Sequence, residues 1–176
     1  STTFEACIVR NNKSENYAGI GNSTVINSLV YGNSGWDNTG SLNNCKVINC
    51  TVVGNKGGYL PNAWTVGGMS GGTAINSIFW DNEGHNSQQI YDATSVTYSD
   101  VQGGYSGDGN IDKDPLFTDS VNDDYHLAKN SPAIGAGKSD GAPSTDIEGK
   151  PRPNPEGSNP DMGAYERPIN YSPILA

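Results

Sequence analysis

Acidic residues and histidines are the side chains in this sequence that could do acid–base chemistry, and they are scattered. Glycoside hydrolysis needs two carboxylates close together, and a lyase acting on uronates needs a basic group beside its substrate. Asp37, Asp81 and Asp92 each stand apart, and the only histidines are His85 and His126. Neither a Ser/His/Asp ordering nor an activated Cys accompanies them. The sequence therefore predicts no catalytic site in this segment and a protein that is not an enzyme.

One acidic stretch has the spacing of a calcium-binding loop. Its oxygen-bearing residues are Asp108, Asn110, Asp112 and Asp114, with Asp119 where a twelfth-position ligand would be. Calcium takes about six to eight oxygen ligands, so this stretch is the candidate metal site. However, Lys113 stands where an EF-hand loop needs glycine, and aspartate replaces the bidentate glutamate. Calcium is one alternative for this stretch, and a turn without metal is the other.

Aromatic residues are the second kind of candidate, because sugar rings stack on exposed aromatic faces. Trp36, Tyr59 and Trp64 fall in stretches of variable sequence. Tyr31 and Trp80 have the parity of outward-facing strand residues. These five residues form the candidate carbohydrate-binding set. The alternative for Tyr31 and Trp80 is that loops cover them.

A repeat that runs through most of the chain must position these candidates. Four segments align without gaps, and a weaker fifth follows: 4–12, 25–33, 47–55, 74–82 and 96–104. Equivalent positions are 21, 22, 27 and 22 residues apart. This period, with Gly- and Asn-rich turns between short apolar runs, predicts an all-β right-handed parallel β-helix of about 21–27 residues per rung. Variable stretches such as 35–42 and 57–70 are predicted loops.

The aligned columns predict which side chains fill the interior. A column of small residues and an apolar column two positions later share one strand face. The small column is Cys7, Ser28, Cys50, Ser77 and Ser99, and the apolar column is Val9, Val30, Val52, Phe79 and Val101. Two positions before the small column, Ile26, Ile48 and Ile75 have the same parity and are also predicted to face inward.

One further column is predicted to face outward, yet its residues are too apolar for a solvent-exposed face. Ile8, Leu29, Thr51 and Ile78 have the opposite parity to the interior columns but are mostly apolar. Either a loop or a partner covers this column, or the inside–outside assignment fails near a bend.

Two columns of asparagine are predicted to form ladders at the bends. One is Asn12, Asn33, Asn55 and Asn82, interrupted at Gly104, and the other is Asn27, Asn49 and Asn76. Asparagine tolerates the backbone of tight turns, and stacked asparagine side chains hydrogen-bond from rung to rung. We assign both columns a structural role.

Charge and cysteine content exclude several classes of function. The net charge is −9 without a basic patch, so nucleic-acid binding is not expected. No apolar run approaches the ~18 residues that a membrane-spanning helix needs. Three cysteines without a C-x-x-C motif predict neither a disulfide framework nor a metal site. Because a repeat begins a few residues after Ser1, we expect a targeting signal to lie upstream.

The second half of the chain carries an ordered series of motifs. TYSDVQG at 97–103 is followed by GNIDKDPLF at 109–117, and then by segments at 125–127, 130–137, 146–152 and 161–166. This series, about 70 residues long, resembles the C-terminal region of bacterial right-handed β-helix proteins with a choice-of-anchor Q domain. The resemblance implies the fold and an exported, cell-surface location, and it implies no single activity.

The repeat and this resemblance together suggest how the chain is divided. Residues 1–105 are predicted to form rungs, and residues 106–176 the last rung and a loop-rich cap of the same solenoid. The Pro- and Gly-rich stretches 114–136 and 142–160 would fold over the open end, which otherwise exposes strand edges. Asp146, Arg152, Asp161 and Glu166 could be mistaken for a catalytic cluster. We interpret them as ion-paired and hydrogen-bonded groups within the cap.

Together these features favour an extracellular structural or adhesive surface module that displays loops from a rigid rod. A special form is a filament subunit that self-associates through its N-terminal rung. A carbohydrate-binding module is the first alternative. The non-catalytic C-terminal part of a polysaccharide lyase or glycoside hydrolase is the second.

Overall fold

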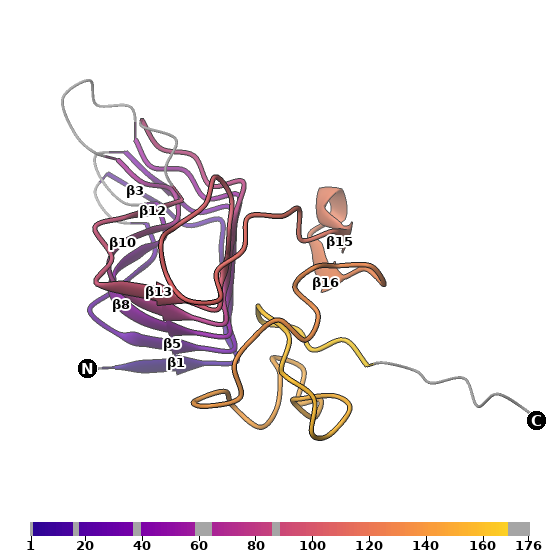
Figure 1. Ribbon diagram of the computed structural model, residues 1–176. Coiled ribbons are helices and arrows are strands. Elements are labelled where there is room, and N and C mark those ends of the chain that lie inside the picture. Colours follow the sequence, from indigo (N-terminus) through magenta and orange to yellow (C-terminus); the bar gives the residue numbers. More distant parts are fainter. Residues whose placement is uncertain (1, 16–17, 37–39, 59–64, 86–88, 169–176) are drawn as a thin grey trace, which may run out of the picture.

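The computed structural model describes residues 2–15, 18–36, 40–58, 65–85 and 89–168. These residues form a nearly all-β parallel solenoid of about four turns, with a less regular C-terminal segment beside it (Figure 1). The predicted solenoid is confirmed. Val-, Ile- and Thr-rich runs of two to seven residues form its strands, because such side chains suit a pleated, half-buried surface.

Parallel sheets run along the solenoid. The first contains β1 (Thr3–Glu5), β4 (Ile20–Gly21), β5 (Thr24–Ile26), β8 (Leu42–Ile48), β10 (Met69–Ile75), β12 (Ile90–Tyr91) and β13 (Ser95–Thr97). The second contains β2 (Ile8–Arg10), β6 (Leu29–Tyr31), β9 (Thr51–Val53), β11 (Ile78–Trp80) and β14 (Asp100–Val101). β3 (Lys13–Ser14) and β7 (Ser34–Gly35) begin a third, which single bridges extend to Lys56 and Glu83.

The strand register matches the alignment of the repeats. In the second sheet, the register runs from Ile8 through Leu29, Thr51 and Ile78 to Asp100. Equivalent residues of successive rungs are therefore direct neighbours. The predicted columns are real stacks in the structure.

The core confirms two predicted columns and corrects a third. Among the small and apolar columns, Cys50, Val52 and Phe79 are fully buried. Ile26 and Ile75, predicted inside, are half-buried on the outside, and Ile48 lies outside the core cluster. The residues one position earlier fill the core instead: Val25, Val47, Ala74 and Val96.

The reason for this correction is the conformation of the second asparagine column. Asn27, Asn49 and Asn76 have φ values of 47°, 47° and 52°, between the strands of the first and second sheets. One residue in the left-handed region turns the chain, so the alternation of faces does not continue across it. The parity argument holds on each side of the bend but not through it.

The first asparagine column forms the predicted ladder. Asn12 donates to Asn33 Oδ1 at 2.9 Å, and Asn33 donates to Asn55 Oδ1 at 2.9 Å. Asn55 in turn donates to Asn82 Oδ1 at 2.9 Å. Gln89, which the sequence did not identify, ends the ladder by accepting from Asn82 Nδ2 at 2.7 Å.

A second, shorter ladder lies inside the small column. The backbone N–H of Cys50 donates to Ser77 Oγ and that of Ser77 donates to Ser99 Oγ, both at 3.1 Å. Asn110 ends this series, because its Oδ1 accepts from the Ser99 N–H at 3.0 Å. The serine hydroxyls therefore serve as acceptors as well as filling the interior, whereas the Cys50 thiol donates to backbone carbonyls.

The C-terminal segment (residues 112–168) contains β15 (Phe117–Asp119), a short 3-10 helix η1 (Ser120–Asn122) and β16 (Asp124–Leu127). It lies beside the solenoid and covers the outer face of the second sheet (Figure 1). This placement corrects the prediction that it folds over the end. It also explains the apolar outer column, since Leu29, Thr51 and Ile78 are buried under it, whereas Ile8 is 58% exposed.

Candidate functional site

The predicted carbohydrate-binding residues are separated by the fold. Tyr59 and Trp64 lie outside the described residues. Tyr31 faces away from the solenoid interior, as its parity predicts, but it is only 6% exposed and packs against the tilted ring of Tyr125 with ring centroids 5.3 Å apart. Trp80 is half-buried among the apolar side chains under the C-terminal segment. Of the two alternatives for Tyr31 and Trp80, the structure agrees with the covered one, because the C-terminal segment packs over both rings.

Trp36 is the member of the set that is open to solvent. Its side chain is 72% exposed. It stands beside a hollow lined by Ser34, Gly35, Trp36, Lys56, Gly57 and Gly58. Lys56 is paired with Glu83 at 3.1 Å on this third face of the solenoid. A flat aromatic surface beside bare glycine backbone is an arrangement that can accept a sugar ring.

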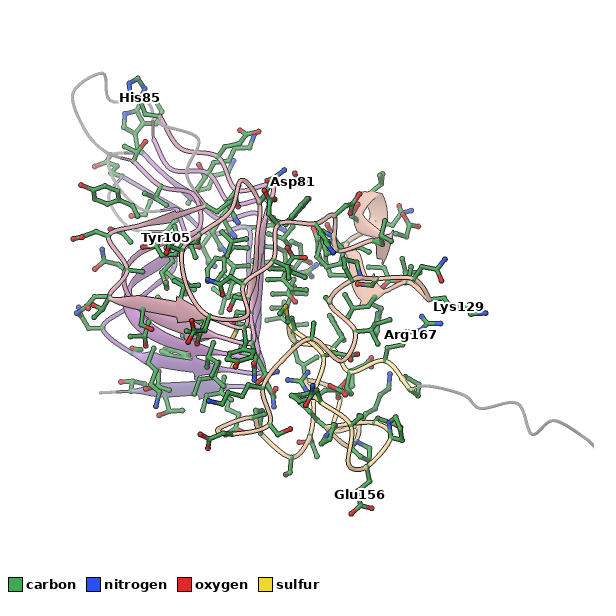
Figure 2. The ribbon with its side chains drawn as sticks, viewed as in Figure 1. Asp81, His85, Tyr105, Lys129, Glu156 and Arg167 are labelled. Carbon is green, nitrogen blue, oxygen red and sulfur yellow. The ribbon has the colours of Figure 1, made fainter. Side chains whose placement is uncertain are left out.

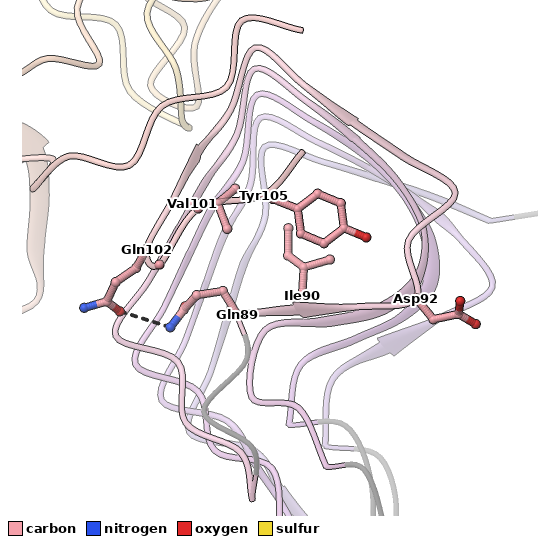
Figure 3. Close-up of a pocket in the computed structure, with 8 residues that line it drawn as sticks. Gln89, Ile90, Asp92, Val101, Gln102 and Tyr105 are labelled. Carbon is pink, nitrogen blue, oxygen red and sulfur yellow. Dashed lines mark hydrogen bonds between the residues drawn. The ribbon is translucent and has the colours of Figure 1, made fainter. Parts of the chain in front are cut away.

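Gln89, Tyr105 and Asn110 close the C-terminal end of the solenoid in place of the predicted cap. Figure 3 shows the ring of Tyr105 lying within the last rung, next to Ile90 and Val101. Its hydroxyl donates to the Ala93 carbonyl at 3.3 Å. The hollow around it has a polar rim, where Gln89 Nε2 donates to Gln102 Oε1 at 3.0 Å (Figure 3).

The residues of the predicted calcium loop are engaged in separate hydrogen bonds. Asn110 points inward, and Asp112 Oδ1 accepts from the Gly103 N–H at 3.0 Å. Asp114 Oδ1 accepts from the Leu116 N–H, and Asp119 Oδ2 accepts from Asn122, while Asp108 is exposed. Within the described ranges, no three His, Cys, Asp or Glu side chains are grouped as a metal site would require. The five-residue loop arrangement is therefore not formed, and calcium binding itself stays a prediction.

Asp100 was missed by the sequence reasoning. It is the last member of the outward column that contains Ile78, and it is 0% exposed. Its Oδ1 accepts from the Lys113 N–H at 3.1 Å, whereas its buried Oδ2 has no hydrogen-bond partner. Burial, and then the charges of Asp112 and Asp114, raise the pKa of Asp100 to about 7. An acid at the end of an apolar column is the signal that could have identified it.

A second unpredicted cluster surrounds His126 on β16. Its Nδ1 lies 2.6 Å from Asp124 Oδ1, and its Nε2 lies 3.1 Å from Glu148 Oε2. The ring also packs against Tyr165, with centroids 4.0 Å apart. Burial lowers the pKa of His126, but the hydrogen bonds with Asp124 and Glu148 outweigh it, so the net shift is upward. The cluster joins β16 to the turn at 146–150.

The structure places the other histidine, His85, and the described isolated acids, Asp81 and Asp92, in different surroundings. His85 lies at the corner of the solenoid near the third sheet, away from Asp81 (Figure 2). Asp81 Oδ1 accepts from Gln102 Nε2 at 3.1 Å, and Asp92 lies at the rim of the hollow beside Tyr105. Asp37 lies outside the described residues. Asp81 and Asp92 face different surroundings, and neither has a second carboxylate as a bonded partner among the described residues.

The four charged residues near the C-terminus form a buried network, as we interpreted them. Arg152 donates from Nε to Glu166 Oε2 at 3.0 Å, and both side chains are fully buried. Arg152 Nη1 also donates to Asn27 Oδ1 at 3.0 Å, which ties the C-terminal segment to the solenoid. Asp146 and Asp161 accept only from backbone N–H groups of their own segment. With every carboxylate engaged internally, the network is structural.

Comparisons of this chain with protein-family models, with curated proteins and with solved structures find no match. The solenoid is established by the structure, and the resemblance of the second half to choice-of-anchor Q proteins stays a prediction. In the part of the chain that the structure describes, no helix is long and apolar enough to cross a membrane.

Proposed function

We propose that this chain is an extracellular structural and adhesive module of a bacterial surface protein, which presents one corner of a rigid solenoid to its surroundings. The resemblance of its second half to choice-of-anchor Q proteins supports the bacterial source and the surface location. The polar ladders support the rigidity, because every rung is joined to the next by side chains as well as by the backbone.

The observation that carries this proposal is the distribution of length between rungs. The first part of each rung runs from the ladder asparagine to the first residue of the next strand in the first sheet. This part is 8, 9, 14 and 8 positions long, for Asn12 to Ile20, Asn33 to Leu42, Asn55 to Met69 and Asn82 to Ile90. The second part of each rung runs from that first-sheet residue to the start of the next strand in the second sheet. It is 9, 9, 9 and 10 positions long, and it ends at Leu29, Thr51, Ile78 and Asp100. Length therefore varies mainly at one corner, as expected where recognition loops are carried on a fixed scaffold.

Bead adhesion tests this proposal. Beads coated with the chain should adhere to immobilised glycans or bacterial envelopes, and deletion of residues 59–64 should abolish adhesion. The melting temperature should change by no more than about 5 °C, because the stack itself is unaltered. Adhesion that is unchanged by the deletion, or turnover of a polysaccharide by the purified chain, would argue against a display module.

Self-association is a special form of the same function. Strands β1, β2 and β3 each pair on one side only within the described residues, and the apolar side chains of Phe4 in β1 and Val9 in β2 are only partly buried. An edge of this kind can pair with another chain. Light scattering and negative-stain microscopy over a concentration series should show growing filaments. A monomer at every concentration would exclude this form.

Carbohydrate binding is the second candidate, favoured by the exposed ring of Trp36 above the glycine-lined hollow. The net charge of −9 favours neutral sugars over uronates. Affinity electrophoresis in neutral polysaccharide gels should show retardation that Trp36→Ala abolishes. Tyr31→Phe is the matched control, because this buried ring should not affect retardation. Equal retardation of the wild type and Trp36→Ala would exclude this surface.

A further inference from the structure

Asp100 is an acidic residue within an apolar column, at the junction between the solenoid and the C-terminal segment. Its neighbours in this column are Ile78 on β11 and Ile111, which a single bridge joins to it. The residue has no exposed surface. Its Oδ1 accepts from the backbone N–H of Lys113, in the C-terminal segment, at 3.1 Å. Its Oδ2 has no hydrogen-bond partner in the part of the chain that the structure describes.

The surroundings of this carboxyl group favour its neutral form. A buried charge that is neither hydrated nor paired is very costly, whereas the protonated group is much less so. Burial, the largest effect, acts with the charges of Asp112 and Asp114 to raise the pKa of Asp100 to about 7, although the N–H and the charge of Lys113 oppose them. Residues 112–114 therefore supply the charges that act on Asp100, and two of the three favour the proton.

We propose that Asp100 is a proton-dependent clasp, which holds the C-terminal segment to the last rung while its carboxyl group is neutral and releases this junction when the group ionises. Because the group is enclosed, its anion can be hydrated only where the junction opens, so ionisation and local opening are coupled. Opening breaks the bond from Lys113 and uncovers Ile78, which the closed junction keeps buried.

The direction of the pH dependence follows from the raised pKa. An aspartate in an open or unfolded chain has a pKa of about 3.9, so the closed junction binds the proton more tightly than the open one. The stabilisation is fully present below about pH 4 and is lost progressively as the pH rises toward the raised pKa of about 7. Above that value the junction stays at its weakest.

Trypsin can measure this opening, because Lys113 is the only lysine or arginine between Lys56 and Lys129. At low protease concentration, the rate of cutting after Lys113 follows the population of the open junction. The rate in the wild type, divided by the rate in Asp100→Asn at the same pH, should rise about ten-fold from pH 6 to pH 8.5. Mass spectrometry of the fragments identifies the cut.

The ratio isolates Asp100 from other effects of pH. It removes the pH dependence of trypsin and that of other buried carboxyl groups such as Glu166, whose pKa burial also raises to about 7. Asp108→Asn is the matched control, because Asp108 is exposed and lies in the neighbouring loop. This variant should be cut with the same pH dependence as the wild type.

Two results would overturn the proposal. One is a ratio that stays constant between pH 6 and pH 8.5, and the other is an Asp108→Asn variant that loses the pH dependence as Asp100→Asn does. Should Asp100→Asn fail to fold, the carboxyl carbon resonance of Asp100 in the wild type decides the question. Its midpoint should lie at about pH 7, and a midpoint at the ordinary value of about 3.9 would mean that the group is charged in the closed junction.

Discussion

The solenoid and the C-terminal segment are both rich in buried polar groups, but they satisfy these groups in different ways. In the solenoid, one asparagine recurs at the same place in four successive rungs, so Asn33 and Asn55 make nearly the same bonds. In the C-terminal segment, each buried polar group has its own partner, and Arg152 with Glu166 is the central pair. The comparison teaches that repetition distributes stability over many similar contacts, whereas an irregular segment concentrates it in a few.

The largest effect is expected where the C-terminal segment depends on one pair. Glu166→Gln should lower the free energy of unfolding of this segment by about 3–5 kcal/mol, because it leaves the Arg152 charge buried without its partner. The measurement belongs at pH 8, since burial raises the pKa of Glu166 to about 7. Limited proteolysis should then cut within residues 140–168, while the solenoid resists digestion.

Glu156→Gln is the matched control for this variant. Glu156 lies on the same segment, is exposed and points away from the molecule (Figure 2). It should leave the digestion pattern unchanged. If both variants are digested at the same rate as the wild type, the buried pair does not hold the segment in place.

A smaller effect is expected in the solenoid, and it should depend on the position in the ladder. Asn55→Ala leaves the buried N–H of Asn33 without its acceptor and removes a side-chain donor from the carbonyl of Val30, and should cost about 3 kcal/mol. Asn12→Ala removes the exposed first member of the ladder and should cost less than about 1 kcal/mol. Urea denaturation of the two variants provides the comparison. Equal losses would contradict a ladder that is stabilised by burial.

The fold was largely predictable because the solenoid repeats itself. The period can be read from aligned pairs such as Cys50 with Ser77 and Val52 with Phe79. It predicts where the strands lie, how they pair and which side chains face the interior, because stacked rungs place equivalent residues together. The prediction failed at Ile26 and Ile75, because a residue with positive φ follows each of them and shifts the face. The alternation of inward and outward side chains along a strand does not indicate where such a bend occurs.

The candidate site was less predictable, because it depends on contacts that occur once. No period links Gln89 to Asn82 or Asn110 to Ser99, although these pairs end the two ladders. The sequence showed that the outer apolar column needed a cover but did not identify it. Pairs such as Tyr31 with Tyr125 join residues far apart in sequence and belong to no repeat.

The smallest effect is expected at the exposed edge of the C-terminal segment, where His126 lies between Asp124 and Glu148. Because folding raises the pKa of His126, the protonated form stabilises the protein. That contribution is fully present below the ordinary histidine pKa of about 6.5 and is lost as the pH rises through the raised value. The side chains are 39% exposed, so solvent screening limits the effect to below about 1 kcal/mol.

Melting curves of the wild type and His126→Gln between pH 5.5 and 8.5 measure this contribution. The wild type should melt up to about 3 °C higher than the variant at pH 5.5, and the difference should shrink toward pH 8.5 and in high salt. The carboxyl pKa values of Asp124 and Glu148 are lowered, by His126 and chiefly by Lys150 respectively, so their own contributions are lost only at more acidic pH. A difference that is constant with pH, or that grows toward alkaline pH, would mean that the ring acts through its packing on Tyr165 and not through its charge.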